Sequence, residues 1–418
     1  MINGKDKMIL RDLAKKVSDI AGLDVMRERR SKWYRHNDLK TAEPLIVVYP
    51  EGAWDELLPH KDLKCEDGEA RGIEWNLLSR IYYHENIDDD SVIKKDWVVH
   101  KNINGLGWNN IDLAIDWGMG SSTERSQNNP RGAYRIDTAI KNIGDIKKLK
   151  IPRISCDEQK TLADFERKQE LFGDILDVKL KGITHVGFHI MYFYIHLRGL
   201  EQTYLDFYDQ PEFAKELIGF FESGLEDIVN QCLELNLFGL NNDDTYVGTG
   251  GFGNTNELPA KNFDPDNVRL YDIWGSAEAQ EMSSVSPEMT EEFVIQCERR
   301  LLSRFGLTAY GCCEALDDKL PYILRLPNMR RLSISPFADV KKCAEILQNK
   351  YIYSWKPNPS YVCSPEFDTA AIKKYLTEAK EYTKNCVLEI ILADTHTCHN
   401  QVYRFKEWVE ICRNIFQK

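Results

Sequence analysis

Two short clusters of thiol, imidazole and carboxylate side chains each follow an apolar run of strand length. One is Tyr-Gly-Cys-Cys-Glu at 310–314, and the other is Asp-Thr-His-Thr-Cys-His at 394–399. Thiolates and imidazoles are common zinc ligands, and a catalytic zinc keeps three protein ligands and one open position. If the two clusters meet in space, Cys312, His396 and Cys398 would supply those ligands. Zinc there would lower the pKa of a thiol substrate and leave a nucleophilic thiolate.

The spacing of these residues leaves other interpretations open. The chain has no CxxC or HExxH pattern, so the spacing alone favours small buried residues for Cys312 and Cys313, and a hydrogen-bonded loop histidine for His396. Adjacent residues on a strand face opposite sides, so only one of the two cysteines would point inward. His185 and His189 are four residues apart and share one face of an expected strand. For them the pattern favours a core or pocket-lining role over metal binding.

Other candidates lie at expected strand ends or in polar motifs. The segment 274–281 carries carboxylates for acid–base chemistry or metal binding, with a solvated helix start as the alternative. The glycine-rich segment 248–253 resembles a phosphate-binding loop but lacks the Lys-Ser/Thr ending, which favours a flexible strand-end loop. Lys356 is a candidate for binding a substrate carboxylate, with a surface lysine as the alternative. The candidate substrate-binding residues are Tyr192, Asn241, Trp274, Tyr310 and Asn358.

A scaffold that brings strand ends together is needed to position these groups. Apolar runs of strand length lie at 44–49, 111–117, 184–190, 236–241, 307–312, 332–335, 351–354 and 387–392. Helical periodicity appears at 8–32, 212–235, 287–305, 339–348, 369–383 and 403–415. Alternating strands and helices predict an α/β fold with parallel strands, and eight strands favour a (β/α)8 TIM barrel. In such a barrel the active site lies at the carboxyl ends of the strands.

The domain organisation expected from the sequence is one barrel domain over 1–418. The range 1–40 would be an N-terminal helical extension. The range 87–131 is rich in Asp, Asn and Gly and would be an elaborated loop insertion or lid.

Composition excludes several classes of function. The formal net charge is −12, whereas nucleic-acid-binding surfaces are basic. No apolar run approaches the ~18 residues of a membrane span, and the polar N-terminus has no signal-peptide core. The 11 cysteines are irregularly spaced, as expected for reduced thiols in a cytoplasmic protein.

Several motifs resemble the uroporphyrinogen decarboxylase superfamily, in particular a bacterial branch known as decarboxylase-domain proteins. The matching motifs lie at 197–200, 204–212, 274–281, 285–289, 310–314, 327–331, 333–340, 356–359 and 394–397. Together they cover about 190–410. The superfamily fold is a (β/α)8 barrel, so the resemblance implies the fold that the strand count also predicts.

The resemblance implies two kinds of activity. True decarboxylases carry an N-terminal Met-Arg-Gln-Ala-Gly-Arg motif whose arginines bind substrate carboxylates, and the comparable stretch here, 29–37, differs. Zinc-dependent methyltransferases of the superfamily move a methyl group between a corrinoid and a thiol. They bind zinc through a His-x-Cys on a middle strand and a Cys after the last strand. Cys312 and Cys398 match those cysteines, whereas Tyr310 replaces the histidine and His396 offers an imidazole instead.

The leading hypothesis is therefore a zinc-dependent, methyltransferase-like enzyme that acts on a small molecule, with a corrinoid delivered by a partner protein. Glu278, Glu314 and Asp394 would act as acid, base or supports of the metal ligands. One alternative is a metal-free decarboxylase of a small or tetrapyrrole-like acid held by Lys356 and Arg331. Another is a non-catalytic binding protein whose strand-end face is filled by side chains. The sequence leaves open whether the chain forms a homodimer.

Overall fold

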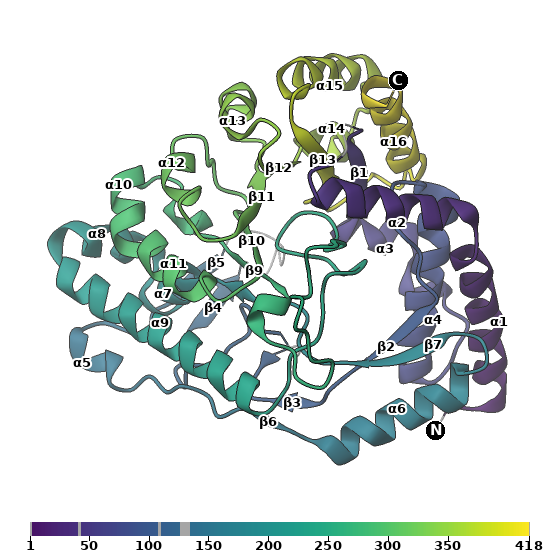
Figure 1. Ribbon diagram of the computed structural model, residues 1–418, viewed down its shortest axis with the longest axis horizontal. Coiled ribbons are helices and arrows are strands. Elements are labelled where there is room, and N and C mark those ends of the chain that lie inside the picture. Colours follow the sequence, from purple (N-terminus) through teal and green to yellow (C-terminus); the bar gives the residue numbers. More distant parts are fainter. Residues whose placement is uncertain (1, 41–42, 108–109, 126–133, 418) are drawn as a thin grey trace.

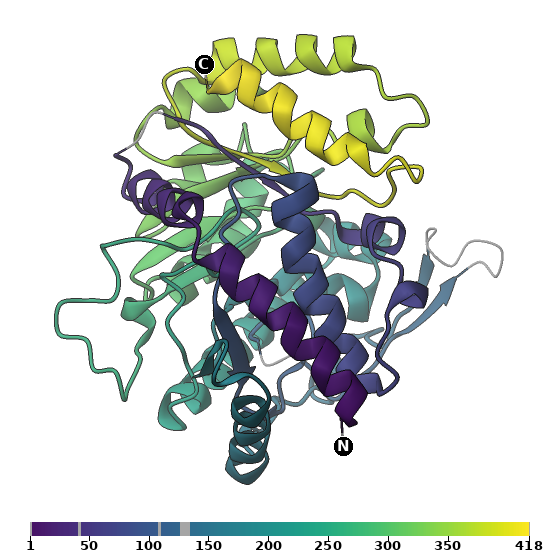
Figure 2. The same ribbon diagram turned by 90° about the vertical axis from the view of Figure 1, so that its right-hand side faces the viewer.

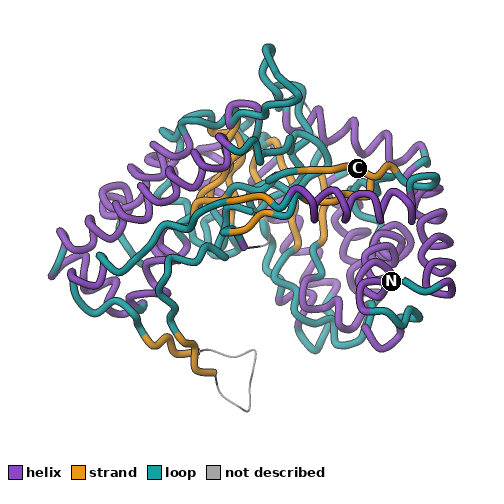
Figure 3. The backbone as a smooth tube through the Cα atoms, turned by 90° about the horizontal axis from the view of Figure 1, so that it is seen from below, coloured by secondary structure: helices purple, strands orange, loops and turns teal. Residues whose placement is uncertain are grey.

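The centre of the molecule is a parallel sheet surrounded by helices (Figures 1 and 3). The computed structural model describes residues 2–40, 43–107, 110–125 and 134–417. The sheet has seven strands in the order β1-β13-β12-β11-β10-β9-β8. These strands are β1 (Leu45–Val48), β8 (Gly187–Phe188), β9 (Trp274–Ala277), β10 (Leu307–Tyr310), β11 (Met329–Ile334), β12 (Ile352–Trp355) and β13 (Val387–Leu392). Each neighbouring pair is parallel, which gives the α/β, barrel-like architecture predicted from the sequence.

Beyond β8 the sheet continues only through isolated contacts. Ile111 pairs with Val186 and Ile183 pairs with Phe238, both in parallel orientation. The runs 111–117 and 236–241, which the sequence predicts as strands, therefore meet the sheet at single residues and form no strand of their own. In the described part of the chain, β1 and β8 are the outermost strands, and a closed eight-stranded barrel stays a prediction.

Two aspartates accept hydrogen bonds from the N–H groups on the outer edge of β1. The Ile46 N–H donates to Asp90 Oδ2 at 2.8 Å, and the Val48 N–H donates to Asp89 Oδ2 at 2.8 Å. The Asp90 N–H also donates to the Ile46 carbonyl at 2.8 Å. Both carboxylates are buried and take the hydrogen-bonding positions of a neighbouring strand. The start of the predicted insertion 87–131 is thus part of the sheet edge.

Strand β9 is the strand of the seven-stranded sheet that the sequence did not predict. Its residues Trp-Gly-Ser-Ala lack the β-branched side chains that favour strands. Its glycine is a packing requirement, because a Cβ at Gly275 would lie 2.6 Å from the ring of Phe305. The alternative of a solvated helix start at 274–281 is wrong, since β9 is fully buried.

The six stretches predicted as helices are helical, whereas the helices at 68–82, 158–172, 190–198 and 200–209 were not predicted. The longer ones are α1 (Gly4–Ala21), α2 (Asp24–Asn37), α4 (Gly68–Tyr82), α6 (Glu158–Phe172), α7 (Ile190–Arg198), α8 (Leu200–Asp209), α9 (Pro211–Glu234), α11 (Gln296–Leu302), α13 (Val340–Leu347), α15 (Thr369–Thr383) and α16 (Tyr403–Phe416). The short ones are α3 (Trp54–Leu57), α5 (Ile143–Ile146), α10 (Pro287–Thr290), α12 (Leu320–Ile323) and α14 (Ser360–Cys363). The predicted helix 8–32 is two helices, because the first ends at Gly22, whose N–H bonds the Ser18 and Asp19 carbonyls. In the described ranges no helix is long and apolar enough to cross a membrane.

A second layer packs beside the sheet. Helix α1 lies along α4, as both ribbon views show (Figures 1 and 2), and α6 adjoins them. These helices and the strand pair β2 (Asp96–His100) with β7 (Asp177–Lys181) enclose their own apolar core. That core contains Leu10, Leu77, Trp97 and Phe172. The remaining strands are the pair β3 (Ile103–Asn104) with β6 (Ser155–Cys156) and the hairpin β4 (Ser122–Arg125) with β5 (Tyr134–Asp137), which projects from the body (Figure 3).

The glycine-rich segment 248–253 packs tightly inside the molecule. A Cβ at Gly250 would lie 2.5 Å from Arg331 Cδ and 2.6 Å from Glu389 Oε1. Arg331 and Glu389 are fully buried and pair at 3.0 Å between Nε and Oε1, and the Gly251 N–H donates to Glu389 Oε1 at 2.9 Å. The glycines therefore serve close packing against a buried ion pair, and the flexible-loop interpretation does not describe them.

Candidate active site

The register of the sheet places the carboxyl ends of its strands side by side. Tyr310 pairs with Ala277 and Trp355 pairs with Ile390. The residues that follow these strands therefore meet at one edge of the sheet. They include Glu278 after β9, Cys312 after β10, Lys356 after β12 and Asp394 after β13.

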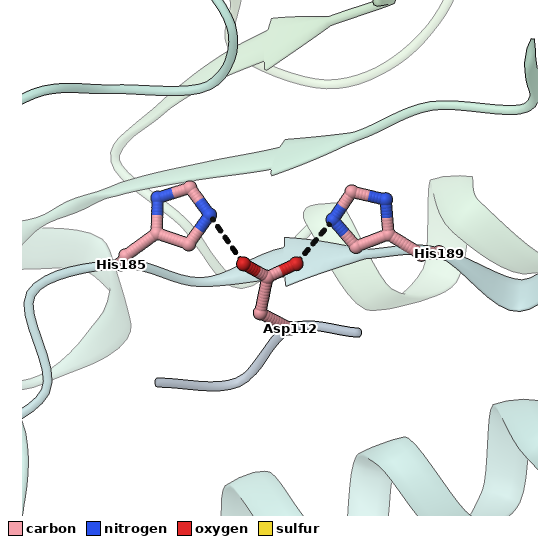
Figure 4. A group of neighbouring side chains, drawn as sticks. All are labelled: Asp112, His185 and His189. Carbon is pink, nitrogen blue, oxygen red and sulfur yellow. Dashed lines mark ion pairs between the residues drawn. The ribbon is translucent and has the colours of Figure 1, made fainter. Parts of the chain in front are cut away.

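Asp112, His185 and His189 form a compact group at this edge, here called the histidine–aspartate triad (Figure 4). His189 Nε2 lies 2.9 Å from Asp112 Oδ1, and His185 Nε2 lies 3.5 Å from Asp112 Oδ2. The ligand atoms of all three lie within 4.8 Å of one another, and no other group of three or more His, Cys, Asp and Glu in the described ranges does so. Two imidazoles and one carboxylate make a three-ligand set that suits a catalytic zinc or another divalent transition metal.

The two histidines differ in their charge. Burial lowers the pKa of His185, so its imidazole is neutral near pH 7 and can bind a metal. Burial also acts to lower the pKa of His189, but its contacts with Asp112 and Glu278 outweigh burial and raise that pKa to about 10. Without a metal, the His189 ring is therefore protonated near pH 7, and its Nε2 forms an ion pair with Asp112. A cation bound to the triad would take the place of that proton.

Glu278 holds His189 from the other side. The distance between His189 Nδ1 and Glu278 Oε1 is 2.6 Å, and the Gln280 N–H donates to Glu278 Oε2 at 2.9 Å. Glu278 is buried at the end of β9, which fixes the position of its carboxylate. A carboxylate that accepts a hydrogen bond from the distal nitrogen of a metal-binding imidazole is typical of metal sites.

Two cavities adjoin the triad. The inner cavity, about 200 Å³, is lined by the triad and by Glu278, Tyr246, Thr249 and Cys312, among others. The rim cavity, about 420 Å³, is lined by Tyr49, Glu51, Tyr246, Thr249, Cys312, Cys313, Lys356, Ala393 and Asp394. Tyr246, Thr249 and Cys312 line both, so the two cavities are neighbours with a shared wall. A strand-end face filled by side chains, as the non-catalytic alternative requires, does not fit these cavities.

The adjacent cysteines face the rim cavity together. Their Sγ atoms are 3.5 Å apart, and Gly311, at φ 97°, turns the chain after β10 so that both line the cavity. The backbone of Cys312 is fixed, since its N–H donates to Glu314 Oε2 at 2.9 Å and its carbonyl accepts from Lys356 Nζ at 3.2 Å. The hydrogen bond from Cys312 lowers the pKa of the Cys313 thiol and raises that of Cys312.

Three further carboxyl groups have raised pKa values and lie outside the lining of the inner cavity: Glu298 and Glu314 are buried, and Glu281 is half-buried. Burial and the charge of Glu278 raise the pKa of Glu281 to about 8, and the same two causes raise the pKa of Glu314. Burial also raises the pKa of Glu298, which accepts a hydrogen bond from the Tyr310 hydroxyl at 2.9 Å. Glu281 thus exchanges a proton near neutral pH, at a position where it feels the charge of Glu278.

The metal set Cys312, His396 and Cys398 is not brought together. Cys398 is fully buried, and its Sγ lies 3.1 Å from Glu56 Oε2, an arrangement in which burial and Glu56 raise the pKa of the thiol to about 12. His396 is exposed, and its Nδ1 lies 3.3 Å from the position of a Cβ on Gly52. Neither His396 nor Cys398 lines the inner or the rim cavity. In this arrangement the three predicted ligands do not form a metal site, and zinc at Cys312, His396 and Cys398 stays a prediction.

The other sequence-derived candidates divide into cavity and scaffold positions. Lys356 and Asp394 line the rim cavity, and Glu278 and Tyr310 line the inner one. Glu314 lies behind Cys312, bonded to its backbone. The other candidates lie outside both linings and contact neighbouring residues. Tyr192 packs against the ring of His196, and Asn241 donates to the Thr184 and Trp274 carbonyls. Trp274 donates to the Gly253 carbonyl, and Asn358 accepts from the Ser360 N–H.

Sequence reasoning missed the triad as a metal set. The spacing of His185 and His189 was a usable signal, because it puts both imidazoles on one side of the chain. Asp112, which completes the set, lies in a run that the sequence predicts as a strand, and nothing in its local pattern marks it. The signal that was lacking is the parallel bridge between Ile111 and Val186, which places Asp112 beside His185.

Comparisons with known proteins support the fold. No protein-family model matches the chain, and no curated protein sequence matches it. A solved structure of a methyltransferase from Methanosarcina mazei is similar, with a TM-score of 0.50 and 10% sequence identity. The match covers 92% of this chain and 98% of that chain. At this identity the likeness shows that nearly the whole chain shares an overall fold with that protein.

Proposed function

We propose that the chain is a metal-dependent, methyltransferase-like enzyme that transfers a methyl group to a thiol at the inner cavity. The observation that carries the proposal is the histidine–aspartate triad on a cavity wall. The activity named for the structural neighbour is methyl transfer, and the resemblance to zinc-dependent methyltransferases suggests zinc as the metal and a corrinoid, presented by a partner protein, as the methyl donor.

The side chains around the triad suit this role. A bound divalent cation would lower the pKa of a thiol ligand and so provide a thiolate nucleophile. Glu278 holds the His189 ring in one orientation through its Nδ1 contact. Glu281, with a pKa of about 8, lies outside both cavity linings and acts on the site only through its charge. The Asp112, His185 and His189 side chains are partly buried, with 13–21% of their surface exposed, which limits the access of water to the reacting atoms.

Metal analysis tests the proposal. Protein purified without added metal is expected to hold about one zinc or other transition metal per chain. The variants His185→Ala and His189→Ala should lose it, while His60→Ala, which changes an exposed histidine, should keep it. The rate of methyl transfer from methylcobalamin to a thiol, measured for the wild type and these three variants, should rise and fall with their metal content. A folded wild-type protein that neither holds nor takes up a transition metal would refute the proposal.

A further inference from the structure

The rim cavity contains opposite charges that do not pair with each other. Lys356 is 5% exposed and lines the cavity, yet in the described ranges no carboxylate lies within ion-pair distance of its Nζ. The hydrogen bond found for Nζ goes to the Cys312 carbonyl at 3.2 Å. The positive charge of Lys356 acts to lower the pKa of Glu51, but the two side chains do not form a close ion pair. A buried ammonium without a paired carboxylate is costly unless a ligand supplies the anionic group. Lys356 therefore marks a position for an anionic group.

Two carboxylates stand in the same cavity on neighbouring segments. The Asp394 N–H donates to Glu51 Oε1 at 3.1 Å, so the two residues are in direct contact. Burial and the charge of Asp394 raise the pKa of Glu51, against the hydrogen bond from Asp394, which lowers it. Both residues have left-handed backbone conformations, with φ 46° and 57°, which side-chain-bearing residues seldom adopt. Strain of this kind is common at ligand-binding positions, and a cation between the carboxylates would relieve their repulsion.

We infer that the rim cavity binds a zwitterionic α-amino acid, with its carboxylate on Lys356 and its ammonium between Glu51 and Asp394. A ligand whose ammonium and carboxylate are attached to the same carbon atom satisfies both sets of groups, which share one cavity without forming an ion pair. The cavity of about 420 Å³ has room for a molecule of that size.

The shared wall of the cavities sets the direction of the side chain. Tyr246, Thr249 and Cys312 line both cavities, so the side chain of a ligand held at Lys356 points toward the inner cavity and the triad when it points toward these three residues. This step rests on the proposed function, which places a reacting thiol at the triad. Together they specify the substrate class as an α-amino acid whose short side chain ends in a thiol.

Four small thiols test the roles of the ammonium and of the carboxylate separately. L-homocysteine carries both, 3-mercaptopropionate lacks the ammonium, cysteamine lacks the carboxylate, and 2-mercaptoethanol lacks both. Calorimetric titration into metal-free and zinc-loaded protein should find L-homocysteine the tightest in both states. Lys356→Met should weaken L-homocysteine and 3-mercaptopropionate by roughly tenfold or more and leave cysteamine unchanged. The double variant Glu51→Gln, Asp394→Asn should weaken L-homocysteine and cysteamine and leave 3-mercaptopropionate unweakened.

The controls make each result decisive. Lys374→Met removes an exposed lysine from α15 and should bind all four thiols like the wild type. If Lys356→Met does not fold, the double variant decides through its effect on cysteamine. Equal binding of the four thiols, or wild-type binding of L-homocysteine by folded Lys356→Met, would overturn the inference. Charge selectivity in a protein that binds no metal would support the inference and refute the proposed function. Zinc binding without charge selectivity would do the reverse.

Discussion

His189 and Glu278 are joined by a contact of 2.6 Å between Nδ1 and Oε1, although 89 residues separate them in the chain. The contact fixes which nitrogen of the imidazole faces Asp112. It also adds a second negative charge beside a ring that already lies 2.9 Å from Asp112. The same arrangement that stabilises a proton on His189 would stabilise a divalent cation, so proton and metal compete for one position.

The role of Glu278 can be tested by a substitution that keeps its shape. Glu278→Gln retains an oxygen that accepts from His189 but removes the charge, so the ring loses electrostatic support. We expect zinc affinity to fall by roughly 10- to 100-fold, as is common when such a carboxylate is altered. Competition titration against a chromophoric chelator measures the change. Glu381→Gln, on the exposed face of α15, is the matched control, and an unchanged affinity in Glu278→Gln would show that the carboxylate does not support a metal ligand.

The raised pKa of His189 predicts a pH dependence of stability in the metal-free protein. Its pKa is about 10 in the folded chain, above the value of about 6.5 in the unfolded chain. The stabilisation from its protonated form is therefore fully present below about pH 6.5 and declines as the pH rises toward 10. The free energy of unfolding of wild type minus that of His189→Gln, from urea titrations at several pH values, should fall across this range. A difference that does not change with pH would contradict the assignment.

Much of the scaffold could be predicted because periodicity is a local property. The helix Thr369–Thr383 has the bounds that its apolar spacing predicts, and β13 occupies the run 387–392. Strand β9 escaped prediction because its small residues are chosen by tertiary packing, as the contact between Gly275 and Phe305 illustrates. The run 111–117 has strand composition, yet only Ile111 pairs with a neighbour.

The site was predictable only in part, for a similar reason. The sequence placed Cys312, Lys356 and Asp394 correctly after strands, because the end of an apolar run marks the end of a buried strand. It named Glu278 as a candidate without predicting the strand before it. Which strand ends meet depends on register and on the path of the connecting segments. That path buries Cys398 against Glu56 and brings Asp112, from a distant segment, to the histidines.

A cysteine substitution separates the two candidate metal sets. Cys398→Ala removes a predicted ligand that contacts Glu56 and lies outside both cavities. We expect zinc content to stay at the wild-type level, with a loss of about 1 kcal/mol in the free energy of unfolding from the lost contact. Elemental analysis and urea unfolding of the same preparation measure both. Loss of zinc from folded Cys398→Ala, with zinc retained in His185→Ala, would instead establish the set Cys312, His396 and Cys398.

The glycine-rich segment offers a test of packing beneath the cavities. The Cβ of Gly250→Ala would come within 2.6 Å of both Arg331 Cδ and Glu389 Oε1, and these two side chains cannot move apart without weakening their buried ion pair. We expect a destabilisation of about 1–3 kcal/mol, the usual range for overpacking. Gly219→Ala, in helix α9, is the matched control, because its Cβ would meet no atom within 4 Å and alanine favours helices by about 1 kcal/mol. Urea unfolding should therefore move the two variants in opposite directions. A Gly250→Ala protein as stable as the wild type would mean that the segment is loosely packed and free to move when a ligand enters the cavities.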